Sequence, residues 1–235
     1  MAAEATQARP QVGPSSTPEP VFVFGSDLGG RHDQYSAAFA VRVHAAEPGK
    51  ASGLTGNAYA IPFRNTSREL LPLETIRHYV TSFLSHAAAS PQTSFQITRF
   101  GCETGAHTDS AMARLFARAS ANCQLPGLWL RELDAKLPAR LLLFDPTGAL
   151  KDSDRLAELR SYLALNAPLW NAPGVELVSV GNARAIVGND VVAKALGLKH
   201  RVFGVNEAYY GREAASAAEM RAVGYATHFL AICNF

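Results

Sequence analysis

Short runs of strand-forming residues alternate along this chain with segments of helical periodicity, and this alternation limits the fold that the chain can adopt. The first strand is predicted at 21–24, where β-branched and aromatic residues run directly into Gly25-Ser26-Asp27. Further strands are expected at 58–61, 94–100, 141–144, 175–180, 201–205 and 228–233, and helices at 34–44, 72–89, 109–119, 153–164, 189–196 and 213–223. Strands joined through helices favour parallel sheets covered on both faces. We therefore predict an α/β protein of two small three-layer domains, each with a mostly parallel sheet.

The chain of 235 residues is long enough for two such domains. Residues 1–20 are rich in Pro, Ala, Ser and Thr and have no hydrophobic period, which predicts a disordered N-terminal arm. We place the first domain at 21–126, a linker at 127–138 and the second domain at 139–235.

Composition excludes several classes of function. The formal net charge of +2 gives no electrostatic footprint for binding DNA or RNA, and no apolar run is long enough to cross a membrane. The three cysteines are too few and too scattered for a disulfide framework, so we expect a reducing, cytoplasmic setting. His44, His78 and His86 have no partner at ligand spacing, so no metal site is expected.

Three glycine-containing loops of the first domain are candidates for binding a ligand. They contain the candidate residues Gly25, Ser26, Asp27, Gly29, Gly30 and Arg31, then Gly56 and Asn57, and then Gly101, Cys102 and Gly105. Glycines allow a ligand to approach the backbone, and amides at a strand-to-helix turn donate to phosphate oxygens. The alternative is that these glycines serve only tight turns and that Arg31 is a solvated side chain.

Catalytic candidates are weaker. Asp27 and Glu103 are carboxylates positioned to orient a water molecule, but neither has an identified partner in the sequence. Cys102 follows a strand, where a nucleophile could lie, but a cysteine in such a place is more often a small apolar filler. Whether the protein is an enzyme or a binding protein therefore stays open.

The segments VFVFGSDLGGRH, GLTGNAYAIPFRN, LPLETIRHYV and FQITRFGCETGAH, in this order, resemble a phage-associated family of uncharacterised non-structural proteins. The resemblance covers about residues 21–126, and the loops of that family are in turn similar to those of a short macrodomain. It implies a pocket for the phosphates of ADP-ribose. This chain departs from the pattern at Asp33-Gln34-Tyr35, where the family has Gly-Ala-Gly, and at Glu103, where the family has glycine.

The second half carries Gly181-Asn182-Ala183-Arg184 after a predicted strand and Tyr210-Gly211-Arg212 before a helix. In order and spacing these segments resemble the SLOG superfamily of Rossmann-like nucleotide-binding proteins. The resemblance covers about 139–235 and implies that Gly181, Asn182, Arg184 and Arg212 contact a nucleotide. An N-capped helix and a surface arginine are the alternative explanation. The Arg-Asn pair that follows the second segment in that superfamily is missing here.

Both resemblances imply a nucleotide-derived diphosphate ligand, such as ADP-ribose or an NAD-related molecule, with no other cofactor required. The expected function is binding or sensing of such a molecule, within NAD or ADP-ribose metabolism during phage infection or host defence. The alternative is a non-catalytic interaction protein whose nucleotide sites have degenerated. A protein partner or a homo-oligomer is compatible with either hypothesis.

Overall fold

The computed structural model describes residues 18–102, 106–144, 150, 152–170, 174–181 and 183–231. Its first half contains β1 (Val21–Asp27), α1 (Tyr35–His44), β2 (Gly53–Thr55), β3 (Ala58–Arg64), α2 (Leu73–Ala89), β4 (Phe95–Ile97), α3 (Asp109–Leu115), β5 (Cys123–Gln124) and α4 (Gly127–Leu133). Its second half contains β6 (Arg140–Phe144), α5 (Ser153–Trp170), β7 (Glu176–Gly181), α6 (Ala183–Leu196), β8 (Lys199–Gly204), α7 (Glu207–Tyr210), the 3₁₀ turn η2 (Gly211–Glu213), α8 (Ala214–Tyr225) and β9 (His228–Ala231). None of the described helices is long and apolar enough to span a membrane.

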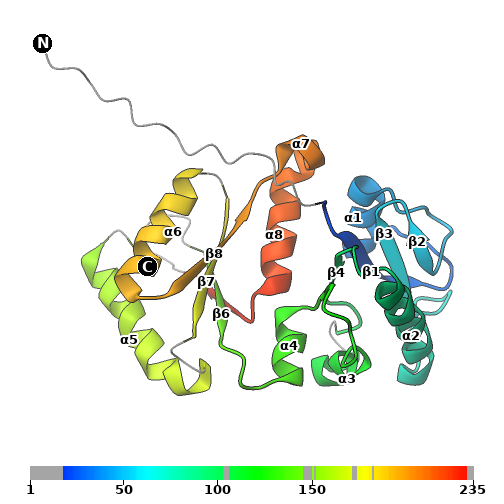
Figure 1. Cartoon of the computed structure of the whole chain (residues 1–235), viewed down its shortest axis with the longest axis horizontal. Helices are drawn as coiled ribbons and strands as arrows, with labels where there is room; N and C mark the ends of the chain where they lie inside the picture. Colours follow the sequence, from blue (N-terminus) through cyan, green and yellow to red (C-terminus); the bar gives the residue numbers. More distant parts are fainter. Residues whose placement is uncertain are drawn as a thin grey trace, which may run out of the picture.

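Two mostly parallel sheets organise these elements, as predicted (Figure 1). The first sheet has the strand order β2-β3-β1-β4-β5, and its pairs are parallel except for the β2–β3 hairpin. The second sheet has the order β8-β7-β6-β9, and all its pairs are parallel. The α/β class that the alternating pattern predicted is therefore confirmed.

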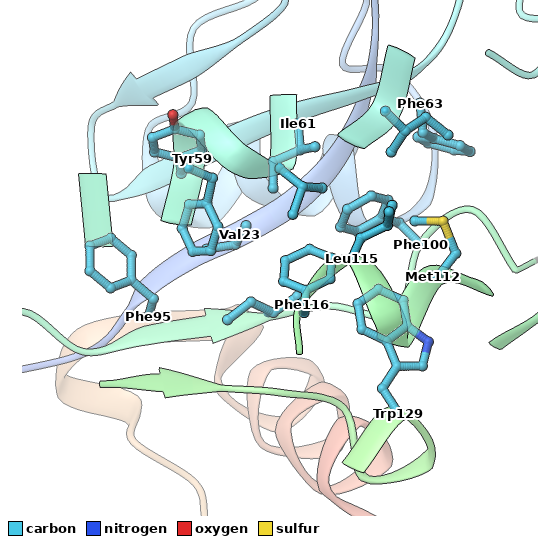
Figure 2. Close-up of a cluster of buried hydrophobic side chains, with 14 of the residues drawn as sticks. Val23, Tyr59, Ile61, Phe63, Phe95, Phe100, Met112, Leu115, Phe116 and Trp129 are labelled. Atoms are coloured by element: carbon cyan, nitrogen blue, oxygen red, sulfur yellow. The ribbon is translucent and has the colours of Figure 1, made fainter. Parts of the chain in front are cut away.

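The first sheet is apolar on both faces, which explains why β1 and β3 read as continuous hydrophobic runs. On one face Val23 and Ile61 pack with α2, α3 and α4 around aromatic side chains that include Phe95, Phe116 and Trp129 (Figure 2). All five of these side chains are at most 1% exposed. This face holds the largest hydrophobic core of the molecule.

The opposite face of the first sheet is covered by helices from both halves of the chain. Phe22 and Phe24 of β1 pack there against Phe39 of α1, and Ala214 and Ala217 of α8 join the same cluster. Helix α8 also contacts β6, β7 and β8 of the second sheet, so it lies between the two sheets (Figure 1). The two halves thus share one helical layer.

The second sheet packs its other face against α5 and α6. Leu141 and Leu143 of β6 and Leu177 of β7 form the centre of that core, with Leu159 of α5 and Val192 of α6 against them. All of these side chains are buried. The core is almost purely aliphatic, unlike the aromatic core of the first sheet.

Two strand predictions in the first half need correction. The strand expected at 94–100 ends at Ile97. Just beyond its end, the backbone N–H and the hydroxyl of Thr98 both donate to the carbonyl of Val23, each at 2.9 Å. Residues 53–55, expected as loop, instead form β2, which pairs antiparallel with β3. The hairpin turns at Gly56, whose φ of +54° lies in the left-handed region.

Three other boundaries differ from the sequence prediction. The segment expected as a linker contains α4, whose Trp129 is fully buried in the first core. Helix α6 begins at Ala183 rather than at residue 189. The arm expected through residue 20 includes ordered residues at its end, because Glu19 accepts hydrogen bonds from Asn206 (3.0 Å) and Tyr210 (2.8 Å).

Candidate functional site

The order of strands in the first sheet identifies the edge at which a ligand would bind. The chain passes from β1 through α1 to β3 on one side, and then through α2 to β4 on the other side of β1. Helix α1 packs on one face of the sheet and α2 on the other. The connections therefore diverge at the carboxyl end of β1, and such a switch point is where open α/β sheets place their ligand crevices.

A cleft of about 140 Å³ opens at this carboxyl end. Its walls come from the end of β1, the loop to α1, the first turn of α1 and the end of β3, with Phe100 from the segment after β4. We call it the β1 cleft. Gly25, Ser26, Asp27 and Arg31, which the sequence singled out, all line it.

The loop after β1 is held in shape by Asp27. Its carboxylate accepts the backbone N–H of Gly29 at 2.8 Å and that of Arg31 at 3.3 Å, and also the Nε–H of Arg31 at 3.0 Å. Hydrogen bonds from Arg31 and Gly29 keep the pKa of Asp27 below its ordinary value, although burial opposes this shift. Because its carboxylate is engaged by its own loop, Asp27 positions the loop and is poorly placed to activate a water molecule.

His32 is a buried polar side chain in the wall of the β1 cleft. Its side chain is only 6% exposed, and neither ring nitrogen has a hydrogen-bond partner among the described residues. Its ring meets Phe24 edge-on at 4.9 Å between centroids. Burial lowers the pKa of His32, with the Asp27 charge acting against it, so the imidazole is neutral near pH 7. A neutral imidazole can donate one hydrogen bond and accept another.

The N-terminus of α1 opens into the same cleft. No side chain caps this end, and its first turn contains no acidic residue, while Gln34, Ser36 and Ala37 line the cleft. Unpaired amides and the helix dipole make such a terminus attractive to an anion. Tyr35 at the first helical position has a φ of +45°, a strained conformation for a bulky residue, and its side chain is 88% exposed beside the cleft.

Guanidinium groups dominate the charge of the β1 cleft. Arg31, Arg64 and Arg68 line it together with the carboxylates of Asp27 and Asp33. Asp27 pairs with Arg31, and Asp33 pairs with Arg68. The three cations outnumber the two carboxylates in the wall, which favours a bound anion.

The glycines of the β1 loop are explained first by packing. A Cβ on Gly25 would lie 2.6 Å from Cβ of Phe100 and 2.7 Å from the Phe63 ring. A Cβ on Gly30 would lie 2.6 Å from the backbone of Gly49, and Gly30 has a φ of +66°. Gly29 is less confined, since its nearest neighbour would be the Asp27 carboxylate at 3.1 Å. Close packing and turn geometry are thus sufficient to explain why glycine stands at positions 25 and 30, with or without a ligand.

Gly56 and Asn57, expected in the same pocket, do not line the β1 cleft. They precede β3, which runs parallel to β1 with Ala58 opposite Phe22, so they lie at the amino edge of the sheet. Asn57 donates from Nδ2 to the Pro20 carbonyl and to the Tyr209 hydroxyl, both at 3.2 Å. It therefore joins the arm and the second half of the chain.

The third loop places its residues beside the first core. Gly101 has a φ of +73°, and Cys102 is half-buried and packs against that core. Burial, followed by the Asp109 charge, raises the pKa of the Cys102 thiol to about 12, so it has almost no thiolate at neutral pH. This argues against a nucleophilic Cys102. The candidates Glu103 and Gly105 lie outside the described residues.

In the second half, Gly181 ends β7 with a φ of +138°, and Asn182 lies outside the described residues. Arg184 belongs to the first turn of α6, but its side chain is not among those described. Arg212 lies in η2 with a side chain 92% exposed, next to Glu213, which pairs with Arg42 of α1 at 3.7 Å. Arg212 thus belongs to the segment that meets the first half.

Several residues that line the β1 cleft were not among the candidate ligand-binding residues of the sequence, including His32, Tyr35, Arg64 and Arg68. His32 and Tyr35 flank the loop that the sequence did indicate, and a histidine directly after Gly-Gly-Arg was the available signal. Arg64 and Arg68 come from the end of β3 and the segment after it, and nothing in their local sequence distinguishes them from surface arginines. Among the described residues no group of His, Cys, Asp and Glu could hold a metal ion.

In comparisons with known proteins, no family model, curated protein or solved structure matches the chain.

Proposed function

We propose that the protein binds the phosphate groups of a nucleotide-derived diphosphate, such as ADP-ribose or an NAD-related molecule, in the β1 cleft. The observation that carries the proposal is His32, a buried imidazole without a partner among the described residues, in the wall of a cleft at a switch point. The uncapped N-terminus of α1 beside it supplies a second, independent attraction for an anion.

The size of the cleft indicates how such a ligand would lie. Small-molecule sites usually enclose about 300–1,000 Å³, and the β1 cleft encloses about 140 Å³. It would therefore take the phosphates and leave the nucleosides outside, where the exposed ring of Tyr35 offers a stacking surface. Tyr35 is bulkier than the small residues that the phage-associated family has in this segment. Because Tyr35 is 88% exposed, it leaves the cleft open.

The proposal is for binding and not for hydrolysis. Asp27 is engaged by Gly29 and Arg31, and the pKa of Cys102 is about 12. Neither group is then available as a general base or nucleophile. The resemblance to a phage-associated family supports a role in NAD or ADP-ribose metabolism during infection.

A thermal-shift screen with ADP-ribose, NAD, AMP and cyclic ADP-ribose tests the proposal. At 100 times the dissociation constant, a ligand specific for the folded state adds about 2.7 kcal/mol to the free energy of unfolding. The Arg68→Gln variant removes one guanidinium from the cleft wall and should bind about tenfold more weakly. Arg77→Gln on the surface of α2 is the matched control and should bind like the wild type.

A wild-type protein that none of these nucleotides stabilises would contradict the proposal. Equal affinity in the wild type and in folded Arg68→Gln would place any binding elsewhere on the molecule.

One observation favours the second candidate, an interaction protein. Phe144, Val223 and Phe229 are large apolar side chains that are 50% exposed or more, and Phe229 lies on the edge strand β9 of the second sheet. Exposed large apolar side chains and an unpaired strand edge are typical of protein interfaces. Analytical ultracentrifugation of wild type and Phe229→Ser tests this candidate, since self-association through this face should weaken in the variant.

A further inference from the structure

A second cavity, of about 320 Å³, lies between the two halves of the chain. Residues of β4 and β5, including Gln96 and Gln124, form its wall on the side of the first sheet. Residues of β6, β8 and α8 form the wall on the other side. We call it the inter-sheet cavity, and its volume is within the range of small-molecule sites, about 300–1,000 Å³.

Three arginines from three different elements line the inter-sheet cavity: Arg140 of β6, Arg201 of β8 and Arg221 of α8. The guanidinium of Arg140 lies 4.0 Å from the centre of the Tyr225 ring, and that of Arg201 lies 5.3 Å from the same centre. Two like charges are thus held against one aromatic ring.

The hydrogen-bonding capacity of these arginines is incompletely used. Within the described part of the chain, the side chain of Arg140 makes one long hydrogen bond, of 3.5 Å, to the carbonyl of Tyr225. Arg221 donates to the carbonyl of Gly204 at 3.1 Å and pairs with Glu19 at 3.5 Å, but its buried Nε has no partner among the described residues. A guanidinium offers five N–H donors, so each of these side chains can still donate to a ligand.

The neighbouring carboxylates offset only part of the charge of the cavity wall, because Glu19 pairs with Arg221 and no ion pair is recorded for Arg140 or Arg201 among the described residues. Glu19 is occupied by Asn206, Tyr210 and Arg221, and Glu176 accepts the Tyr225 hydroxyl at 2.6 Å. Neither lines the cavity, and the described residues that do line it include no Asp or Glu. An anion in the cavity would relieve the repulsion between the guanidiniums.

We propose that the inter-sheet cavity is a binding site for a small phosphomonoester, whose phosphate lies among Arg140, Arg201 and Arg221. The side-chain amides of Gln96 and Gln124 then face the rest of the ligand from the first sheet, so that the ligand bridges the two halves. This site is separate from the β1 cleft, and it does not depend on what the β1 cleft binds.

Calorimetric titration of the full chain with AMP, inorganic phosphate and adenosine tests the proposal. Arg201 lies on an edge strand, and its described contacts are with the rings of Phe203 and Tyr225, so Arg201→Gln should fold normally. We expect this variant to bind AMP about tenfold more weakly or worse, because a charge-assisted contact is lost. Arg201→Lys keeps the charge without the planar fork and should bind with intermediate affinity.

Two comparisons make the result specific. Arg155→Gln, on the exposed face of α5, should bind AMP like the wild type, and Arg68→Gln should leave this site unchanged. Phosphate should bind more weakly than AMP, and adenosine more weakly still. Wild-type affinity in Arg201→Gln, adenosine binding as tightly as AMP, or absence of AMP binding would each overturn the proposal.

Discussion

Two buried histidines lie near opposite ends of β1 and have different neighbours. His32 follows the carboxyl end of β1 and faces the β1 cleft. His44 stacks on Phe22 near the amino end, with ring centroids 4.6 Å apart and the planes nearly parallel, and its Nδ1 has no partner among the described residues. The sequence analysis excluded His44 from a metal site, but it did not reveal that either histidine is buried.

His44 makes stability depend on pH. Burial lowers its pKa from 6.5 to about 4, with Arg221 acting in the same direction and Glu19 against it. Since the unfolded chain binds the proton more tightly, stability is fully present above pH 6.5 and falls as the pH drops toward 4, by up to roughly 3 kcal/mol. Urea unfolding at pH 7.5 and pH 4.5 measures the loss, which His44→Leu should reduce. Identical pH dependence in the variant would contradict this assignment.

Gly56 and Gly53 form a matched pair for the role of glycine in the β2–β3 hairpin. Both have positive φ, of +54° and +98°. A Cβ on Gly56 would meet the carbonyl oxygens of His44 and Ala45, whereas a Cβ on Gly53 would meet nothing within 4 Å. We expect Gly53→Ala to cost about 1 kcal/mol through strain alone, and Gly56→Ala about 2 kcal/mol more. Equal losses in urea unfolding would show that the close approach is unimportant.

Two substitutions of Tyr35 distinguish the backbone strain at this position from the contribution of the ring to ligand binding. Tyr35→Gly and Tyr35→Ala both remove the exposed ring, but only glycine adopts a φ of +45° without strain. We therefore expect Tyr35→Gly to be about 1 kcal/mol more stable than Tyr35→Ala in urea unfolding. Both should bind ADP-ribose more weakly than the wild type. If Tyr35→Ala is the more stable of the two, the backbone at this position is not strained.

At this scale the sequence predicted which loops matter but not why. Gly25 and Gly30 were identified from a glycine-rich turn, yet each is required by a neighbour from a distant segment, Phe100 in one case and Gly49 in the other. Asn57 was assigned to a ligand and instead bonds to Tyr209. Local sequence carries no information about which distant segment will approach.

Among the elements, α4 shows where the sequence pattern was insufficient. Its seven residues follow Pro126 and form too short a segment to define a helical period, so a linker was the natural prediction. Tertiary contacts fix the position of α4. Trp129 is fully buried and donates its Nε1–H to Asp109 of α3 at 2.9 Å. The long, strongly periodic α2 was by contrast predictable.

Asp109 connects α3 to α4 and to the segment that follows β4. Its carboxylate accepts both Nε–H and Nη2–H of Arg99, at 2.7 and 2.8 Å, in addition to the Trp129 indole. Hydrogen bonds from Arg99 lower the pKa of Asp109, the opposing effect of burial being smaller. Asp109→Ala leaves the buried indole N–H unpaired and should lower the free energy of unfolding by about 2–3 kcal/mol in urea. Asp154→Ala, in the first turn of α5, is the control and should cost less than about 0.5 kcal/mol.

For the whole molecule, the shared layer makes a prediction about cooperativity. Helix α8, which has 12 residues, packs Ala214 and Ala217 onto the first sheet and also contacts the second sheet. Neither half can lose α8 without exposing an apolar face. We expect one calorimetric unfolding transition, with equal van't Hoff and calorimetric enthalpies. Ala217→Glu should move that transition down as a unit. Two separate transitions would show that the halves are independent domains.

The α/β class and the two parallel sheets followed from the alternation of strands and helices, because that pattern is local and repeats along the chain. The shared layer did not follow, since the alanine-rich α8 resembles any small-residue helix in the sequence. Its partners, Phe22 and Phe39, lie more than 150 residues away. The same holds for the inter-sheet cavity, whose arginines come from three distant segments.

If the β1 cleft receives a phosphate group at His32, as we claim, the nitrogen resonances of the histidine rings will report the contact. Titration of ADP-ribose into the ¹⁵N-labelled protein should shift the ring signals of His32 as its nitrogens gain a partner. Those of His44, which is equally buried at the other edge of the sheet, should stay in place. His32→Leu identifies the signals. Binding detected by calorimetry without any change at His32, or no binding at all, would contradict the claim.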